Sequence, residues 1–290
     1  MQKLFPSEPS TYKRLPMILI VASNKDPASQ NIKQQILSRY SFKQITETYQ
    51  KNPLCKAEIN NRNIILATLS QESVGAQYLA EDFPDAKLVV FISRHSSQSG
   101  KPTLSVHTPG NFAEAELGGL PKTVSVAPAV AMQTALKALV HYQNPLLLHY
   151  EVSYECTHHG PSLNVPTMFV ELGSSEAQWN DTRAAQTIAD ATMTAIVEFR
   201  PPTECAVIGI GGTHYNQKFT LMALMGEAVF GHMIPKYALA NVEAETIREC
   251  MAKTLEKVTW AVLDWKGIRS EDKPDLISAL ETVGLPYKKV

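Results

Sequence analysis

Short runs of hydrophobic residues, many of them β-branched, recur along the chain and are bounded by turn-forming residues. Most runs are apolar at consecutive positions, which is typical of strands in a sheet that is covered on both faces. The expected strands are residues 17–22, 64–69, 88–92, 104–107, 146–152, 167–172 and 205–210. The sequence therefore predicts a sheet that is buried inside the protein.

Segments with a helical spacing of hydrophobic residues separate many of the expected strands. They are residues 27–39, 127–142, 176–198, 217–230 and 242–256. Alternation of strands and helices predicts a three-layer α/β fold with a central mixed, largely parallel sheet flanked by helices. Two strands follow one another closely between residues 92 and 110, which predicts a hairpin and makes the sheet mixed.

The chain contains no internal repeat and no long linker. Residues 17–290 are therefore expected to form a single α/β catalytic domain. Residues 1–16 contain three prolines and are expected to be an N-terminal extension. A short amphipathic helix at 274–282 is assigned a packing role only.

Composition and charge narrow the classes of function. Hydrophobic residues make up 44% and charged residues 19% of the chain, which is typical of a globular protein. With 27 Lys and Arg against 28 Asp and Glu, a globally basic nucleic-acid binder is excluded, so any RNA contact requires a local patch. We find no Cys-x-x-Cys pair, no secretory signal and no apolar stretch of about 20 residues. These features predict a cytoplasmic protein without a membrane partner.

The histidines stand at informative positions. Five of them lie at the downstream end of an expected strand or just beyond it: His95, His107, His158, His159 and His214. Ligand crevices form at that end of the strands in open α/β sheets, so separate segments can converge there on one polar pocket. The turn at Gly160 and Pro161 would let both His158 and His159 face it. His232 is a less certain member.

Imidazoles in such a pocket can act as a general base near neutral pH or bind zinc. The sequence has no His-Glu-x-x-His and no His-x-His pair, so a metal site depends on convergence in space. Glu155, Glu171 and Cys156 are possible further ligands or partners of the imidazoles, although a cysteine flanked by apolar residues is more often core.

Two further segments suggest binding of an anion. Gly211, Gly212 and Thr213 follow an expected strand and lead into a helix, a junction whose backbone amides can approach a phosphate or an oxyanion. A tight packing turn explains the same glycines. Lys218 and Lys236 would add positive charge, although most lysines are only solvated.

The serine-rich segment around Gly100 is a weaker signal. Ser96 and Ser97, with Lys101 at the same tip, are expected to hold a ligand, since no Gly-x-Ser-x-Gly elbow marks a serine nucleophile. A polar loop explains them equally well.

Six ordered motifs together resemble the archaeal and plant type of D-aminoacyl-tRNA deacylase. They are RHSS at 94–97, LSVHTPGN at 104–111, ECTHHGP at 155–161, ELGS at 171–174, GIGGTHY at 209–215, and GH at 231–232 with KY at 236–237. The resemblance spans about residues 17–237 and is weaker beyond. Ser105 and Cys156 stand where this type is expected to have Thr, and neither difference alters a histidine.

The resemblance implies a zinc-containing enzyme with a fold related to the phosphorylase and peptidyl-tRNA-hydrolase group. It implies hydrolysis of the ester between a D-amino acid and the 3′ end of tRNA, in translation quality control and D-amino acid detoxification. We expect a monomer that binds tRNA as substrate. The expected catalytic residues are His95, His107, His158, His159 and His214. The expected substrate-binding residues are Ser96, Ser97, Gly211, Gly212, Thr213, Lys218 and Lys236, and the expected zinc ligands come from His107, His158, His159, Glu155 and Glu171.

Two other functions fit the residues. One is a zinc-dependent hydrolase or phosphorylase-like nucleosidase that acts on a free small molecule. The other is a binding module without catalytic activity, in which the imidazoles recognise the acceptor end of tRNA.

Overall fold

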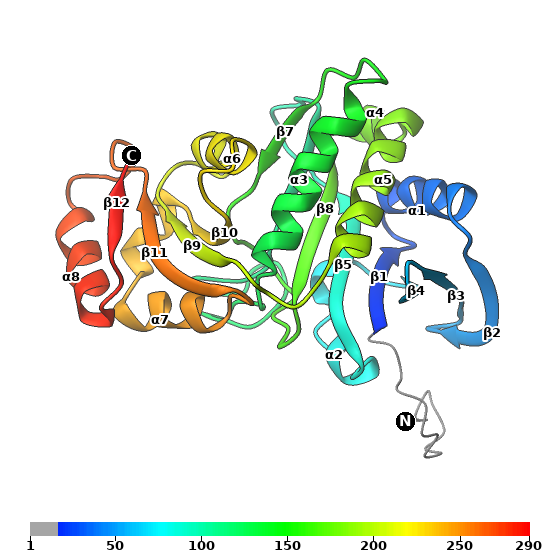
Figure 1. The fold of residues 1–290 in the computed structure, drawn as a ribbon, viewed down its shortest axis with the longest axis horizontal. Coiled ribbons are helices and arrows are strands. Elements are labelled where there is room, and N and C mark those ends of the chain that lie inside the picture. The colour runs from blue at the N-terminus through cyan, green and yellow to red at the C-terminus, as the bar shows by residue number, and fades with distance from the viewer. Residues whose placement is uncertain (1–16) are drawn as a thin grey trace.

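The computed structural model describes residues 17–290, and the expected extension at residues 1–16 lies outside them. It contains an eight-stranded and a four-stranded sheet (Figure 1). The strands of the larger sheet are β1 (Met17–Ser23), β2 (Lys43–Tyr49), β3 (Asn52–Ile59), β4 (Arg62–Leu69), β5 (Ala86–Arg94), β6 (Thr103–His107), β7 (Glu151–Tyr154) and β8 (Thr167–Gly173). Those of the smaller sheet are β9 (Cys205–Ile210), β10 (Phe230–Ile234), β11 (Lys257–Leu263) and β12 (Tyr287–Lys289).

Eight α-helices and two short 3-10 helices accompany the strands of the described chain. The α-helices are α1 (Pro27–Arg39), α2 (Leu79–Asp82), α3 (Ala129–Gln143), α4 (Glu176–Trp179), α5 (Thr182–Glu198), α6 (Gln217–Leu224), α7 (Ala244–Ala252) and α8 (Lys273–Val283). The 3-10 helices are η1 (Ser73–Gly75) and η2 (Lys236–Asn241).

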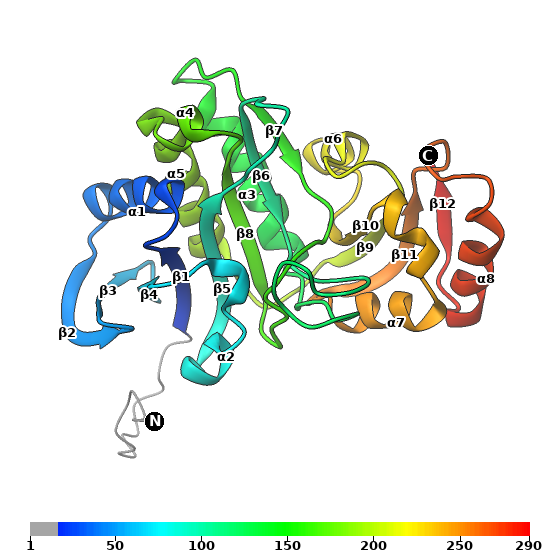
Figure 2. The same cartoon turned by 180° about the vertical axis from the view of Figure 1, so that it is seen from behind.

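The larger sheet has the strand order β2-β3-β4-β1-β5-β8-β6-β7 and is mixed. Its centre, β4-β1-β5-β8, is parallel, while β6 runs antiparallel to β8 and β3 runs antiparallel to both β2 and β4. Helices α1, α3 and α5 cover one face, and α2 lies on the opposite face (Figures 1 and 2). The expected three-layer α/β class is confirmed.

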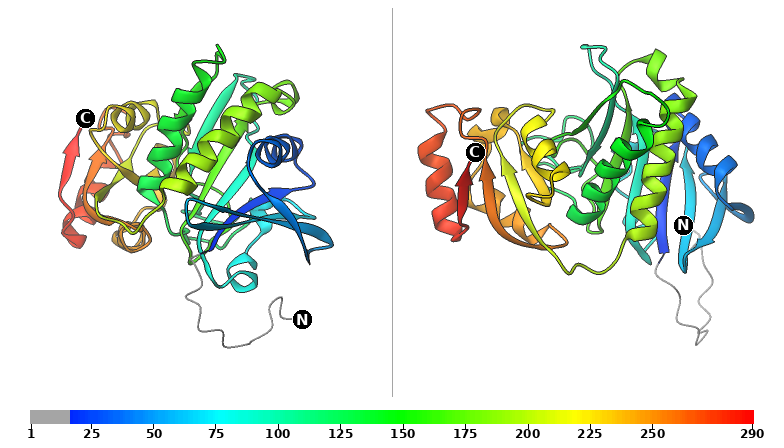
Figure 3. Two further views of the ribbon diagram at one scale, coloured as in Figure 1. Left: turned by 45° about the vertical axis from the view of Figure 1, so that its right-hand side comes forward. Right: turned by 45° about the horizontal axis from the view of Figure 1, so that its top comes forward.

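The smaller sheet is entirely parallel, in the order β10-β9-β11-β12. Helices α7 and α8 pack on one face, while α6 and α3 share a hydrophobic core with the other. Helix α3 also packs against β6 and β7, so one helix lies between the two sheets (Figure 3). The carboxyl ends of β7 and β9 meet there, because Glu155 pairs with Tyr215 in an isolated antiparallel bridge.

Local capping sets the helix limits. Asp26 accepts a hydrogen bond from the Ser29 amide at 2.9 Å and Pro27 opens α1, so the expected helix at 27–39 is confirmed. The single helix expected at 176–198 is wrong, because Asp181 caps a new helix: its side chain accepts from the amides of Arg183 and Ala184.

Several expected boundaries are also wrong. The strand expected at 146–152 is instead β7, preceded by a turn at 144–147. The helix expected at 217–230 ends at Leu224, where the turn at Gly226 (φ +76°) leads into β10. The helix expected at 242–256 ends at Ala252, and β11 follows it.

The hairpin expected within residues 92–110 is wrong as well. Strand β8 lies between β5 and β6 and pairs with both of them. The intervening segment therefore crosses the end of β8, and the amides of His95 and Ser97 donate to the carbonyls of Leu172 and Ser174. This crossing places His95 at the carboxyl end of β8. Within residues 17–290, no helix combines the length and the apolar character that crossing a membrane requires.

Candidate functional site

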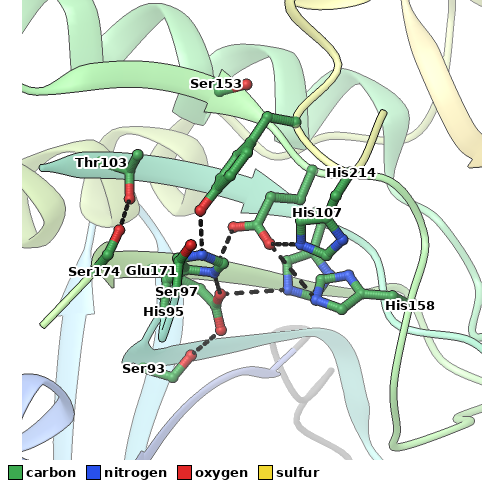
Figure 4. Close-up of polar contacts among 12 residues, drawn as sticks. Ser93, His95, Ser97, Thr103, His107, Ser153, His158, Glu171, Ser174 and His214 are labelled. Atoms are coloured by element: carbon green, nitrogen blue, oxygen red, sulfur yellow. Dashed lines mark hydrogen bonds and ion pairs between the residues drawn. The ribbon is translucent and has the colours of Figure 1, made fainter. Parts of the chain in front are cut away.

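Strand ends of the larger sheet and one of the smaller sheet bring the expected histidines together; Figure 4 shows His95, His107, His158 and His214. His95 follows β5, His107 is the last residue of β6, and Glu171 lies in β8. Glu155, His158 and His159 follow β7, and His214 follows β9. We refer to these seven residues as the His–Glu cluster. The expected convergence of the five histidines is observed.

Three imidazoles form the inner part of the cluster. The ring centroids of His107 and His158 lie 4.2 Å apart, those of His158 and His159 4.3 Å, and those of His107 and His159 4.9 Å. His107 is fully buried, and neither of its ring nitrogens has a hydrogen-bond partner. Glu171 Oε2 is 3.7 Å from His107 Nε2, beyond hydrogen-bonding distance. An unsatisfied buried imidazole costs free energy, so this position suits a ligand atom of a metal.

Two buried glutamates connect the outer histidines. Glu155 lies 2.7 Å from His214 Nε2, 3.1 Å from His95 Nδ1 and 3.5 Å from His158 Nε2. Glu171 accepts a hydrogen bond of 2.8 Å from Ser93 Oγ and lies 3.5 Å from His95 Nδ1. The two carboxylates therefore act as a common anionic centre.

These contacts divide the histidines into two groups. Burial lowers the pKa of His95, but its bonds to Glu155 and Glu171 outweigh burial and raise the pKa to about 11. Burial opposes the charge of His214 too, but Cys156 and Glu155 raise its pKa to about 10. Both rings are therefore cationic at neutral pH.

The inner rings behave in the opposite way. Burial, and then the neighbouring His107, lowers the pKa of His159 to about 4, and burial with His107 and His159 lowers that of His158 well below its usual value. Neutral imidazoles are the form that binds a metal. Burial alone would raise the pKa of Glu155, but the bonds from His214 and His95 hold it well below its usual value, so this carboxylate is ionised.

The cluster borders two cavities. The first, of about 510 Å³, is lined by His95, His158, His159, His214, Glu171 and Phe169 among others, and we call it the histidine cavity. A smaller cavity of about 310 Å³ shares His158 and His159 and includes Tyr237. The exposed side chain of Leu117 borders both.

The expected substrate-binding residues divide between two places. Ser96 lines the histidine cavity, whereas Ser97 lies outside its lining and bonds to Ser99 Oγ at 3.0 Å. Gly212, Thr213, Lys218 and Lys236 line a different cavity of about 540 Å³, together with Lys101 and Tyr215, which we call the lysine cavity. Gly211 is not part of that lining, and its amide donates to the Ile234 carbonyl at 2.8 Å.

The side chain of Tyr215 lies between the lysine cavity and the cluster. It lines the lysine cavity while its hydroxyl bonds to His95 Nε2. The position of Tyr215 in the sequence did not predict this role, since a tyrosine in a glycine-rich loop has many other uses. The hydroxyl of Tyr237 lies 3.3 Å from Cys156 Sγ and 3.4 Å from His214 Nδ1. Its position in the sequence did not signal this role, because an exposed tyrosine in a short helix such as η2 is common.

Two further candidates from the sequence, His232 and Cys156, lie outside the His–Glu cluster. His232 is fully buried in β10 and bonds to Thr157 Oγ1 and the Lys253 carbonyl, so its role is structural. Cys156 is also buried, yet its sulfur lies 3.5 Å from His214 Nδ1. Within residues 17–290, Cys156, His158 and His214 form one of four groups whose ligand atoms could hold a metal ion.

The absence of a side chain at Gly173 lets His95 approach β8 closely. A Cβ added at Gly173 would lie 2.8 Å from His95 Cβ and 2.8 Å from Thr103 Oγ1. Gly173→Ala is therefore expected to displace His95 and to destabilise the fold by about 1–3 kcal/mol. Activity should fall about tenfold or more, because misplaced catalytic groups cost rate. The matched control Gly75→Ala meets nothing within 4 Å and should retain both; equal behaviour of the two variants would contradict the prediction.

The fold and the cluster together define an α/β protein with a histidine–carboxylate centre at the carboxyl ends of its strands. The profile of one family, D-aminoacyl-tRNA deacylase, matches residues 82–288. The D-aminoacyl-tRNA deacylase of Pyrococcus abyssi is 33% identical over 279 residues, which is 94% of this chain and 100% of the relative. That of Methanococcus vannielii is 35% identical over 94% of this chain and 99% of the relative. The chain therefore belongs to the D-aminoacyl-tRNA deacylase family.

One solved structure supports the fold. A crystal structure described as that of a conserved protein of unknown function is similar, with a TM-score of 0.82 and 29% identity over 94% of this chain and 95% of that one. A purine nucleoside phosphorylase from Toxoplasma gondii has a TM-score of only 0.42 at 13% identity, over 63% of this chain and 90% of that one.

Proposed function

We propose that this protein hydrolyses the ester between a D-amino acid and the 3′ end of tRNA, releasing free tRNA and the D-amino acid. The observation that carries the proposal is the His–Glu cluster, which borders a cavity for the acyl group and touches, through Tyr215, a second cavity with cationic walls. Membership of the deacylase family supports the same substrate. Residues of both sheets build the cluster, so we propose that residues 17–290 act as one catalytic domain, as a monomer.

The cluster offers a route for each proton of the hydrolysis. Water attacks the ester carbonyl carbon and passes a proton to ionised Glu155. The bond to the ribose oxygen then breaks, and this oxygen takes a proton from the Tyr215 hydroxyl, which recovers one from the cationic ring of His95. Cationic His214 stabilises the oxyanion that forms on the carbonyl oxygen. Glu155 afterwards loses its proton to solvent and His95 regains one, so the net change is the addition of water.

We further propose that His107, His158 and His159 hold a zinc ion, with Glu155 or Glu171 as a further ligand. Two observations support a fit. The ligand atoms of His107, His158 and His159 lie within 4.8 Å of one another, as do those of His107, Glu155 and Glu171. Both nitrogens of buried His107 lack a hydrogen-bond partner. Neutral imidazoles with a carboxylate are a donor set that zinc prefers. Bound zinc supplies a Lewis acid and lowers the pKa of water near the ester.

Metal content tests the zinc proposal directly. The purified protein should contain zinc, and His158→Ala should lose most of it because the variant removes one of three imidazole ligands. Elemental analysis measures the metal, and thermal unfolding with and without a chelator measures its contribution to stability. His149→Ala, which replaces an exposed histidine outside the cluster, in the loop before β7, is the control. Equal zinc content in wild type and His158→Ala would contradict the ligand assignment.

The lysine cavity is proposed to hold the terminal nucleotide. Lys101 and Lys236 make no ion pair within residues 17–290, and the amides of Gly212 and Thr213 donate to no group of that part of the chain. Free ammonium groups and amides are the donors that a phosphate uses. Lys218 contributes less charge, because it forms an ion pair with Asp264.

Substrate comparison separates the proposal from its alternatives. D-tyrosyl-tRNA should be hydrolysed far more efficiently than a D-tyrosine ester without a nucleotide, and L-tyrosyl-tRNA should be spared. Equal efficiency with and without tRNA would favour a hydrolase of small molecules. Binding of tRNA with an intact ester, in zinc-saturated protein, would favour a binding module.

A further inference from the structure

A cationic and aromatic surface lies on the smaller sheet, outside the three cavities described above. Lys289 Nζ is 3.8 Å and Lys273 Nζ 4.6 Å from the centroid of the Trp265 ring, and Lys289 Nζ is 5.8 Å from that of Tyr287. Tyr287 and Lys289 are exposed on β12, an edge strand. We call these four residues the Trp265 surface.

The charges of the Trp265 surface are not compensated. Neither ammonium lies within 4 Å of a carboxylate of residues 17–290, whereas the nearby Asp272 and Glu271 are paired with Arg269. Two like charges over one ring repel each other, and a cation–π contact at an exposed site is worth only about 0.5–1 kcal/mol. A polyanion with planar groups would relieve this repulsion, since phosphates pair with lysines and bases stack on aromatic rings.

The Trp265 surface continues directly from the lysine cavity. Asp264 and Gly267, on either side of Trp265 and Lys266, line that cavity. The Trp265 amide donates to the Val290 carbonyl at 3.3 Å, and Lys218 Nζ donates to the same carbonyl at 3.2 Å. The ends of β11 and β12 lie beside α6 (Figure 1). A nucleic-acid strand whose terminal nucleotide lies in the lysine cavity can therefore leave this cavity over β11 and β12.

We propose that the Trp265 surface binds the sugar-phosphate backbone of tRNA just upstream of the nucleotide in the lysine cavity. This inference rests on the proposed function. Lys273 and Lys289 contact phosphates, and Trp265 and Tyr287 offer faces to unpaired bases or riboses. The surface thereby adds affinity for tRNA that a short ester cannot use.

The test replaces both lysines, as Lys273→Gln with Lys289→Gln, and compares two substrates. For D-tyrosyl-tRNA we expect KM to rise about tenfold with kcat unchanged, and the salt dependence of log KM to flatten by about 1.4, from about 0.7 for each of two lost phosphate contacts to a single strand. The D-tyrosyl ester of adenosine should be hydrolysed as by the wild type. The control Lys43→Gln with Lys56→Gln removes two exposed lysines that face each other on β2 and β3, at the other end of the larger sheet.

Direct binding of uncharged tRNA keeps the two proposals distinct. Its Kd should rise about as much as KM in the double variant, whether or not the ester is hydrolysed. Unchanged Kd and salt slope would overturn the inference, as would an equal loss on the adenosine ester or an equal effect of the control. A wild-type protein that binds tRNA through this surface but cleaves no ester would refute the proposed function alone.

Discussion

Glu155→Gln is expected to lower kcat for deacylation by about 10³-fold, within the 10²–10⁴ range for loss of a general base. The carboxylate is fully buried and contacts three imidazoles, of which His95 and His214 depend on its charge. An amide removes both the proton acceptor and one of the two groups that raise the pKa of each of these rings. The pKa values of both histidines should therefore fall, which NMR titration of their ring protons can measure.

A second buried glutamate provides the control for this experiment. Glu256 lies outside the cluster and accepts hydrogen bonds from the amides of Ala129 and Val130 at 2.9 and 3.0 Å, where α3 begins. Glu256→Gln should cost stability without lowering kcat. If Glu155→Gln retained kcat, or if both variants lost it equally, Glu155 would not be the base.

The sequence was most informative where burial alone determines the structure. The strands β1, β5 and β8 are buried at nearly every position, and their consecutive apolar residues predicted them well. Strand β2 was missed because it is a largely exposed edge strand with the sequence KQITETY, in which only Tyr49 is buried. Strands β10 and β11 were missed because each closely follows a helix. A short apolar run does not reveal where the helix ends and the strand begins.

The site could likewise be predicted only as far as the positions of the strands determine it. Histidines at strand ends predicted the cluster, since the sheet fixes where those ends meet. Which residues fall into which cavity depends on the crossing of residues 95–102 over β8, which the sequence does not encode as a recognisable motif. Tyr215 bonding to His95, 120 positions away in the chain, is a product of that crossing.

Acid should destabilise the protein through His232, a buried histidine outside the His–Glu cluster. Burial, aided by the charge of Lys253, lowers the pKa of His232 to about 4, although its bonds to the carbonyls of Lys253 and Ser125 oppose this. The native protein therefore binds fewer protons than the unfolded chain between about pH 6.5 and 4. Neutral His232 makes its full contribution to the free energy of unfolding above pH 6.5. As the pH falls toward 4, the free energy of unfolding decreases by at most about 3 kcal/mol.

The variant His232→Gln isolates this contribution. A glutamine remains neutral and can donate to the Lys253 carbonyl, which His232 Nε2 approaches at 3.1 Å, but it loses packing and the contact with Thr157. We expect the variant to be less stable than wild type at pH 7.5 and the difference to shrink or reverse at pH 4.5, as measured by urea unfolding. The exposed His149→Gln should follow the wild-type pH dependence. A stability difference between His232→Gln and wild type that stays constant with pH would mean that His232 takes up its proton as readily in the native protein as in the unfolded chain.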